Sequence, residues 1–130
     1  MRDDTARRGM DTRRQVLGSD HVDAAVAGSS SFTAEFQEFI TRYAWGEIWS
    51  RPGLDRRTRS CVTLVALVAL GHRHELEMHV RAALRNGLTP QELKEVFLQC
   101  AIYCGVPAAA SAFALAQPIV EAWQSDGEAQ

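Results

Sequence analysis

The amino-acid sequence predicts an all-α protein, one compact helical domain that spans residues 1–130 and contains about six helices. From Ser31 onward, apolar residues recur at spacings of three and four, which is the spacing of one face of a helix. The breaks between these segments fall at glycine and proline. No segment alternates with period two, and no Asn-Gly or Asp-Gly pair separates two strand-like runs.

Composition limits the class of protein. The 130 residues are 46% hydrophobic and 23% charged with a formal net charge of −2, so nothing favours nucleic acid or an anionic membrane as a partner. No apolar core of a secretory signal is visible, and the longest apolar run has about half the length that spans a bilayer. The three cysteines show neither C-x-x-C nor zinc-type spacing, which is typical of buried thiols in a reducing compartment. We therefore expect a cytoplasmic protein that does not enter a membrane.

The first two segments differ in pattern. Residues 1–30 are polar and rich in small side chains, and they predict an N-terminal arm with at most a short helix near Thr12–Leu17. The next segment is an amphipathic helix that ends by Trp49, because Arg51 and the Pro-Gly pair after it signal a turn. The apolar face of this helix consists of Phe32, Phe36, Phe39, Ile40 and Tyr43.

Two further helices follow in the middle of the chain. Asp55 is suited to cap the first of them, which runs to Leu70 and is ended by Gly71. Its second half is apolar on all sides, which predicts a buried helix. The other helix spans His72 to Arg85, with a glycine at position 87 as the signal for its C-terminus.

The last two helices have clear starts. Thr89-Pro90-Gln91-Glu92 combines an N-cap, a proline at the first helical position and a capping-box glutamate, and the helix it opens stops at Gly105. An alanine-rich helix then runs from Ala108 to about Trp123. Two strongly apolar helices in so short a chain leave more apolar surface than one core covers, so we expect a homo-oligomer.

Three stretches carry a resemblance to a known family: Tyr43–Ser60 (YAWGEIWSRPGLDRRTRS), Glu75–Val96 and Ile102–Ala109. They resemble the carboxymuconolactone decarboxylase family of the alkyl hydroperoxidase D (AhpD)-like superfamily, and Arg13–Ala25 is similar to the N-terminal stretch of that family. The resemblance covers nearly the whole chain, and the W-G-x-x-W-S-R-P-G-L string is specific to the decarboxylase branch. It implies an all-helical, AhpD-like subunit that assembles as trimers or hexamers and needs no metal or organic cofactor.

The superfamily also contains thiol peroxidases, in which a C-x-x-C motif is followed, after three further residues, by a histidine. The histidine matches at His79, but the two cysteine positions hold His72 and Glu75. Thiol peroxidase chemistry needs a nucleophilic and a resolving sulfur close together. The sequence therefore predicts that this chain is not a thiol peroxidase.

The activity that the resemblance implies is decarboxylation of γ-carboxymuconolactone to β-ketoadipate enol-lactone, in the protocatechuate branch of the β-ketoadipate pathway. This substrate is a small butenolide with two carboxylates, one on the ring and one on an acetate arm. Loss of CO₂ leaves an electron pair conjugated into the lactone carbonyl, so the substrate is its own electron sink. The protein must supply cationic anchors, donors at the carbonyl oxygen and one general acid.

His79 is the candidate acid, because imidazole titrates near neutral pH. Glu75 lies one turn earlier and is placed to orient and charge the ring. On spacing alone, a half-buried structural histidine is the commoner explanation, and the family position of His79 is what favours catalysis. A metal site at His72, Glu75 and His79 is disfavoured, because three ligands on two turns of one helix converge poorly on an ion; we expect no metal.

Four arginines lie around the turn and the helix N-terminus after it: Arg51, Arg56, Arg57 and Arg59. A helix N-terminus favours an anion, and arginine binds a carboxylate through two donors. A solvated basic first turn explains at least two of the four. Arg51 and Arg59 are the two that we predict to bind substrate.

Trp45 and Trp49 lie one turn apart, and Trp45 is a candidate wall of the substrate site, an oligomer contact or a core residue. Tyr103 is a weaker candidate for substrate binding, since its hydroxyl needs a partner at the end of a buried helix. Two other functions remain as alternatives: a related lactone-processing decarboxylase or isomerase of a biosynthetic pathway, and a non-catalytic helical oligomer. The roles of three further residues stay open: His72, His74 and Glu95.

Overall fold

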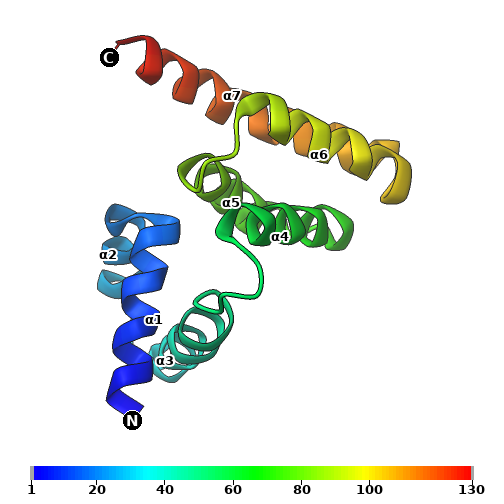
Figure 1. Cartoon of the computed structure of the whole chain (residues 1–130). Coiled ribbons are helices and arrows are strands. Elements are labelled where there is room, and N and C mark those ends of the chain that lie inside the picture. The colour runs from blue at the N-terminus through cyan, green and yellow to red at the C-terminus, as the bar shows by residue number, and fades with distance from the viewer. Residues whose placement is uncertain (1, 130) are drawn as a thin grey trace. The chain divides into compact units, whose positions relative to one another are not determined.

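The computed structural model describes residues 2–129, which contain seven α-helices, one π-helical segment and no strand (Figure 1). The all-α prediction is confirmed. The helices are α1 (Arg2–Leu17), α2 (Ser19–Ala27), α3 (Ala34–Ile40), η1 (Thr41–Ile48), α4 (Arg56–Leu70), α5 (Arg73–Arg85), α6 (Pro90–Tyr103) and α7 (Val106–Ala129). Within the described residues, none of them is long and apolar enough to cross a membrane.

The chain divides into two compact units, one up to Arg56 and one from Arg57 onward. Each is described by itself. The first unit holds α1, α2, α3 and η1, and the second holds nearly all of α4 together with α5, α6 and α7. A single domain over residues 1–130 stays a prediction.

The prediction of at most a short helix in the first 30 residues was wrong. α1 has 16 residues and α2 has nine, and only Gly18, with a φ of 91°, lies between them. The buried stripe of α1 consists of Gly9, Thr12, Arg13 and Val16. Its spacing of three and four is helical, but it carries only one aliphatic side chain, and a search for apolar periodicity does not detect it.

α1 packs on η1 through two glycines. A Cβ atom on Gly9 would lie 1.9 Å from the carbonyl oxygen of Thr41, and one on Gly46 would lie 2.7 Å from the carbonyl oxygen of Thr5. Only glycine permits so close an approach of two backbones. Arg8 adds a hydrogen bond from its Nε to the carbonyl oxygen of Gly46, at 3.0 Å.

Arg13 is the buried cation of the first unit, with 5% of its surface exposed. Its guanidinium donates to Thr41 Oγ1 at 3.2 Å and to Gln37 Oε1 at 3.0 Å. Both acceptors are neutral, and burial lowers the pKa of Arg13. The side chain therefore joins α1 to both α3 and η1.

η1 continues α3 with wider turns, as the bond from Trp49 N–H to the Ala44 oxygen, five residues back, shows at 2.8 Å. The residues of η1 that are buried are Thr41, Trp45 and Gly46. The apolar face that the sequence predicted for this region lies instead at the surface: Phe32, Phe36, Phe39 and Tyr43 are all exposed.

Most helix ends predicted for the second unit are confirmed, but the prediction that the last helix ends near Trp123 was wrong, because α7 continues to Ala129. α4 begins one residue after Asp55, and Gly71, Gly87 and Gly105 have φ values of 74°, 101° and 103°. Thr89 forms the capping box that its sequence predicts. These glycines take the left-handed conformation that ends a helix.

The core of the second unit joins α4, α5, α6 and α7 through side chains that include Leu64, Val80, Phe97 and Ile119. The prediction that the second half of α4 is buried on all sides was wrong. Leu64 and Val68 are buried, but Val62 and Leu70 are 58% and 69% exposed. One face of α4 therefore remains uncovered in the described chain.

Candidate functional site

His79 lies on the core side of α5, where Leu76, Val80, Ala83 and Leu84 are also buried. Only 8% of its surface is exposed, and its Nδ1 atom is buried. Histidine is usually more exposed than this. The imidazole is thus held in a restricted environment, as a positioned acid requires.

Glu75 lies one turn before His79 on α5, as predicted, but its side chain is exposed while the imidazole is buried. His72 is the residue before α5, with a φ of −83° and a ψ of 80°, and its side chain makes no capping hydrogen bond. Residues 2–129 contain no group of three His, Cys, Asp or Glu side chains that could hold a metal ion.

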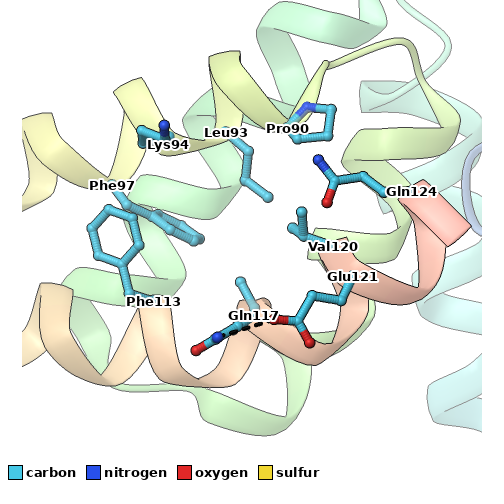
Figure 2. A pocket seen from close by; sticks show the side chains of 10 residues that line it. Pro90, Leu93, Lys94, Phe97, Phe113, Gln117, Val120, Glu121 and Gln124 are labelled. Atoms are coloured by element: carbon cyan, nitrogen blue, oxygen red, sulfur yellow. Dashed lines mark hydrogen bonds between the residues drawn. The ribbon is translucent and has the colours of Figure 1, made fainter.

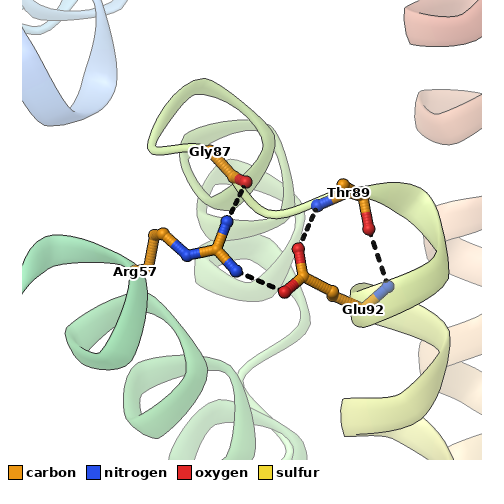
Figure 3. A network of polar contacts seen from close by, with 4 residues as sticks. All are labelled: Arg57, Gly87, Thr89 and Glu92. Carbon is orange, nitrogen blue, oxygen red and sulfur yellow. Dashed lines mark hydrogen bonds and ion pairs between the residues drawn. The ribbon is translucent and has the colours of Figure 1, made fainter.

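Arg57 belongs to a polar network that links three parts of the second unit (Figure 3). Its guanidinium donates to the carbonyl oxygen of Gly87, in the turn after α5, and to the carboxylate of Glu92 at the start of α6. Glu92 also accepts from the backbone N–H of Thr89 at 3.0 Å. This N–H and then the guanidinium lower the pKa of Glu92. The Arg57 side chain therefore has a structural role, because it connects α4 to the turn after α5 and to the start of α6.

The other three arginines have different surroundings. Arg56 donates to Gln15 Oε1 at 2.7 Å inside the first unit. Arg51 is exposed in the first unit, and Arg59 is half-buried on α4 in the second; each makes interactions of its own. All four arginines thus have interactions within the described residues. The substrate-binding roles of Arg51 and Arg59 remain predictions.

The pairing of α4 with α5 sets the level of Arg59 relative to His79. Asn86, which follows α5, donates from Nδ2 to Ser60 Oγ at 3.1 Å, and Arg59 precedes Ser60. His79 lies seven residues before Asn86, or about 10 Å along the helix axis. Arg59 and His79 therefore lie on two helices of the second unit that this hydrogen bond connects.

The two aromatic candidates differ in burial. Trp45 is 6% exposed, and its ring stacks on that of Trp49 with 5.3 Å between centroids, so it is a core residue of the first unit. Tyr103 ends α6 and is 79% exposed. Tyr103 does lie at the end of a helix, but the expectation that this end is buried was wrong.

A cavity of about 300 Å³ lies between α6 and α7 (Figure 2). Phe97 and Phe113 form an edge-to-face pair at one side of it, with centroids 5.5 Å apart. Its polar groups include the Lys94 ammonium and the Gln117 amide, which donates to Glu121 at 3.0 Å. The lining has neither histidine nor arginine, so this cavity contains none of the residues that the sequence predicts to act on the substrate.

Two other hollows belong to the second unit. An open groove of about 480 Å³ between α4 and α6 is mostly apolar, and Glu95 is the charged residue in its lining. A smaller cavity of about 140 Å³ lies where α4, α5 and α7 meet, and its lining includes Leu76 and Arg73 of α5. Arg73 is a cation in this lining that the sequence did not single out, because nothing in its local pattern marks it.

The sequence of this chain is similar to the sequences of known proteins. Residues 34–118 match the profile of the carboxymuconolactone decarboxylase family. The chain belongs to this family. It is 48% identical over 113 residues to 4-carboxymuconolactone decarboxylase from Acinetobacter baylyi, which covers 87% of this chain and 84% of that protein. It is 40% identical over 120 residues to nitrosuccinic acid decarboxylase from Metarhizium robertsii, covering 92% and 84%. A 39-residue stretch is 51% identical to 4-carboxymuconolactone decarboxylase from Pseudomonas putida, covering 30% and 81%.

The cysteines of this family member are free thiols, and Cys100 on α6 is buried. Burial, and then the neighbouring Cys104 thiol, raise the pKa of Cys100 to about 11. A thiol with so high a pKa is almost wholly protonated at neutral pH and is a poor nucleophile. That the chain is not a thiol peroxidase stays a prediction.

Proposed function

We propose that this carboxy-lyase of the carboxymuconolactone decarboxylase family removes CO₂ from γ-carboxymuconolactone and forms β-ketoadipate enol-lactone, in the protocatechuate branch of the β-ketoadipate pathway. The observation that carries the proposal is the 48% identity, over most of both chains, to a decarboxylase named for that substrate. The buried imidazole of His79 on α5 supports it, since the reaction needs a positioned proton donor.

The reaction needs few groups from the protein, because the substrate itself stabilises the negative charge that forms. As the bond from the ring carbon to the carboxylate breaks, its electron pair moves into the ring double bond and on to the lactone carbonyl oxygen. The dienolate that results is protonated on the carbon next to the carbonyl, which gives the enol-lactone. The lactone itself takes up the electron pair, and for this reason we propose a reaction without a cofactor.

In this scheme His79 delivers the proton, and Arg59 and Arg51 are proposed to hold the carboxylates. Arginine suits this role because it offers two parallel donors to one carboxylate and remains charged. Glu75 is proposed to support the protonated imidazole once substrate is bound. Trp45 and Tyr103 are proposed to lie next to the substrate. Trp45 would form part of the packed wall of the site, and Tyr103 would offer its exposed hydroxyl.

The test is turnover of γ-carboxymuconolactone by the purified chain, followed as CO₂ release and loss of ultraviolet absorbance. In D₂O the product should carry one deuterium, on the carbon next to the lactone carbonyl and with a single configuration. Absence of turnover would retire this proposed function. Deuterium distributed over both configurations would mean that a bulk-solvent proton, and not a held imidazole, completes the reaction.

The role of His79 is tested with His79→Gln, which should lower kcat by about 10²–10⁴-fold. His74→Gln is the matched control, because His74 lies on the same helix but is exposed. Arg59→Gln should raise KM more than it lowers kcat. A His79→Gln enzyme with kcat within tenfold of the wild type excludes His79 as the acid.

A second substrate deserves the same assay because of the 40% identity to nitrosuccinic acid decarboxylase. Nitrosuccinic acid resembles the lactone at the reacting centre: one carbon carries the departing carboxylate, an acetate arm and an electron-withdrawing group. Its electron pair would move into the nitro group instead of a lactone. The ratio of kcat/KM for the two compounds decides between them, and the larger value identifies the better substrate.

We propose further that the enzyme works in the cytoplasm as a homo-oligomer, a trimer or a hexamer. The support is the exposed apolar surface of both units, which includes Phe32, Ile102 and Val106 at 93%, 78% and 68% exposure. The mass of the native particle, measured by light scattering on a size-exclusion column, tests this.

A further inference from the structure

The cavity between α6 and α7 contains none of the residues assigned to decarboxylation (Figure 2). Its volume of about 300 Å³ lies at the lower end of the range for sites that bind small molecules. Each of the two helices contributes side chains at helical spacing, so the walls are two stripes that face each other. The cavity thus belongs to the packing of α6 against α7.

The pairing of Phe97 with Phe113 explains why this space exists. The two rings meet edge to face, with 5.5 Å between centroids, and hold the helices apart at one side of the cavity. Ala116 and Val120 follow on the same stripe of α7 and are smaller, so the space beside the rings is not filled. Phe113 is 37% exposed, so part of its ring can contact a ligand. A compact ligand with an aromatic ring fits this apolar part.

Lys94 places a positive charge at the α6 wall of the cavity. Its ammonium donates to Gln91 Oε1 at 3.4 Å, which is long for a hydrogen bond, and this neutral oxygen does not neutralise the charge. An ammonium has three donors, so others can serve a ligand. The ligand group that such a cation binds best is an anion such as a carboxylate.

Glu121 and Gln117 give the α7 wall the opposite character. Gln117 Nε2 donates to Glu121 Oε1 at 3.0 Å, as Figure 2 shows. This bond orients the amide, so Gln117 Oε1 and the second carboxylate oxygen of Glu121 can accept from a ligand. A hydroxyl group suits these acceptors, whereas a ligand carboxylate at the same place would be repelled by Glu121.

We propose that this cavity binds a small phenol that carries a carboxylate at the far end of its ring. The ring lies against Phe113, the carboxylate meets the Lys94 ammonium, and the phenolic hydroxyl donates to the carboxylate of Glu121. The opposite charges of the two walls determine the orientation of the ligand. The proposal does not rest on the decarboxylase reaction, because the two sets of residues are separate.

The first test compares related compounds on the purified full chain, with binding measured by ligand-observed NMR. 4-Hydroxyphenylacetate carries both groups, phenylacetate lacks the hydroxyl, and 4-(2-hydroxyethyl)phenol lacks the carboxylate. The first compound should bind with a dissociation constant of about 0.1–3 mM, as expected for a ligand of its size. Each of the other two should bind about three- to tenfold more weakly, because one polar contact is lost.

Protein variants test which wall contacts which group. Lys94→Gln should weaken 4-hydroxyphenylacetate about three- to tenfold and leave the compound without a carboxylate unchanged. Glu121→Leu should weaken it by a similar factor and leave phenylacetate unchanged or bound more tightly. Phe113→Leu keeps an apolar side chain but removes the ring, and should weaken all three compounds about threefold. Arg81→Gln is the control for a lost positive charge, since Arg81 is exposed on α5 and lies outside this lining.

Three results overturn the proposal. The first is the absence of saturable binding of 4-hydroxyphenylacetate up to about 10 mM. The second is a Lys94→Gln protein that binds all three compounds as the wild type does, or loses affinity for all three equally. The third is binding that is weakened by His79→Gln and not by Lys94→Gln, which would place the compound in the proposed catalytic site. Circular dichroism checks that each variant is folded. Loss of decarboxylation with unchanged binding bears on the proposed function and not on this cavity.

Discussion

Gly9→Ala is the sharpest test of the packing in the first unit. The added methyl carbon would lie 1.9 Å from the carbonyl oxygen of Thr41 and 3.1 Å from the backbone nitrogen of Gly46. A carbon and an oxygen need about 3.2 Å or more, so α1 must move away from η1 by more than 1 Å. Both of the closest atoms belong to backbone, which cannot turn aside as a side chain can.

The magnitude follows from two opposing effects. Overpacking of this kind costs about 3 kcal/mol, at the upper end of the usual range, because a whole helix must shift. Alanine gains about 1 kcal/mol over glycine inside a helix. The free energy of unfolding should therefore fall by about 2 kcal/mol. The hydrogen bonds of Arg13 to Thr41 and Gln37, which cross the same contact, should also weaken.

The assay is urea unfolding followed by tryptophan fluorescence, since Trp45 and Trp49 lie in this unit. Gly28→Ala is the control, because its methyl carbon would meet its nearest neighbour at an ordinary 3.4 Å. It should change the free energy of unfolding by less than 1 kcal/mol, as expected at a helix end. A Gly9→Ala protein as stable as the wild type would refute the close contact between α1 and η1.

Three other predictions concern the second unit. The pKa of Glu92 is lowered in the folded state, so its carboxylate stabilises the protein above pH 4.5, its pKa in the unfolded chain, and this stabilisation is lost as the pH falls through the folded pKa. In urea unfolding, the free energy of unfolding of Glu92→Gln should lie furthest below that of the wild type at pH 7 and less far below it at pH 3.5. Near pH 8, the rise of the Cys100 pKa from 9.0 to about 11 lowers its thiolate fraction about 100-fold, so mass spectrometry should find it alkylated far more slowly than Cys61. Phe97→Ala removes a ring that is 1% exposed and should lower the free energy of unfolding by about 3–5 kcal/mol in a denaturant titration.

The sequence predicted the second unit well because its signals are local. A capping box or a helix-ending glycine acts within a few residues, and Thr89, Gly87 and Gly105 behave as their sequence context predicts. The first unit was harder to predict. α1 is held by a glycine contact and a buried arginine, and both depend on η1, about 30 residues further along the chain. No local pattern marks Gly9 or Arg13 as interior residues.

The candidate site shows the same division. The position of His79 on the core side of a helix agrees with its pattern, because Leu76, Ala82 and Ala83, three or four residues away, are apolar. The partners of the arginine side chains come from distant segments of the chain. Arg57 donates to a turn 30 residues away, and Arg56 donates to Gln15. Such contacts arise only when the chain folds, and four arginines close in sequence give no sign of them.

The wide turns of η1 affect how the chain can change in length. A π-helical turn accommodates one more residue than an α-helical turn. Deleting one residue between Thr41 and Ile48 would let these turns become ordinary α-helical turns and would keep the segments before and after them in nearly the same relative rotation. A single-residue deletion should therefore be tolerated better in η1 than inside the α-helices of the first unit.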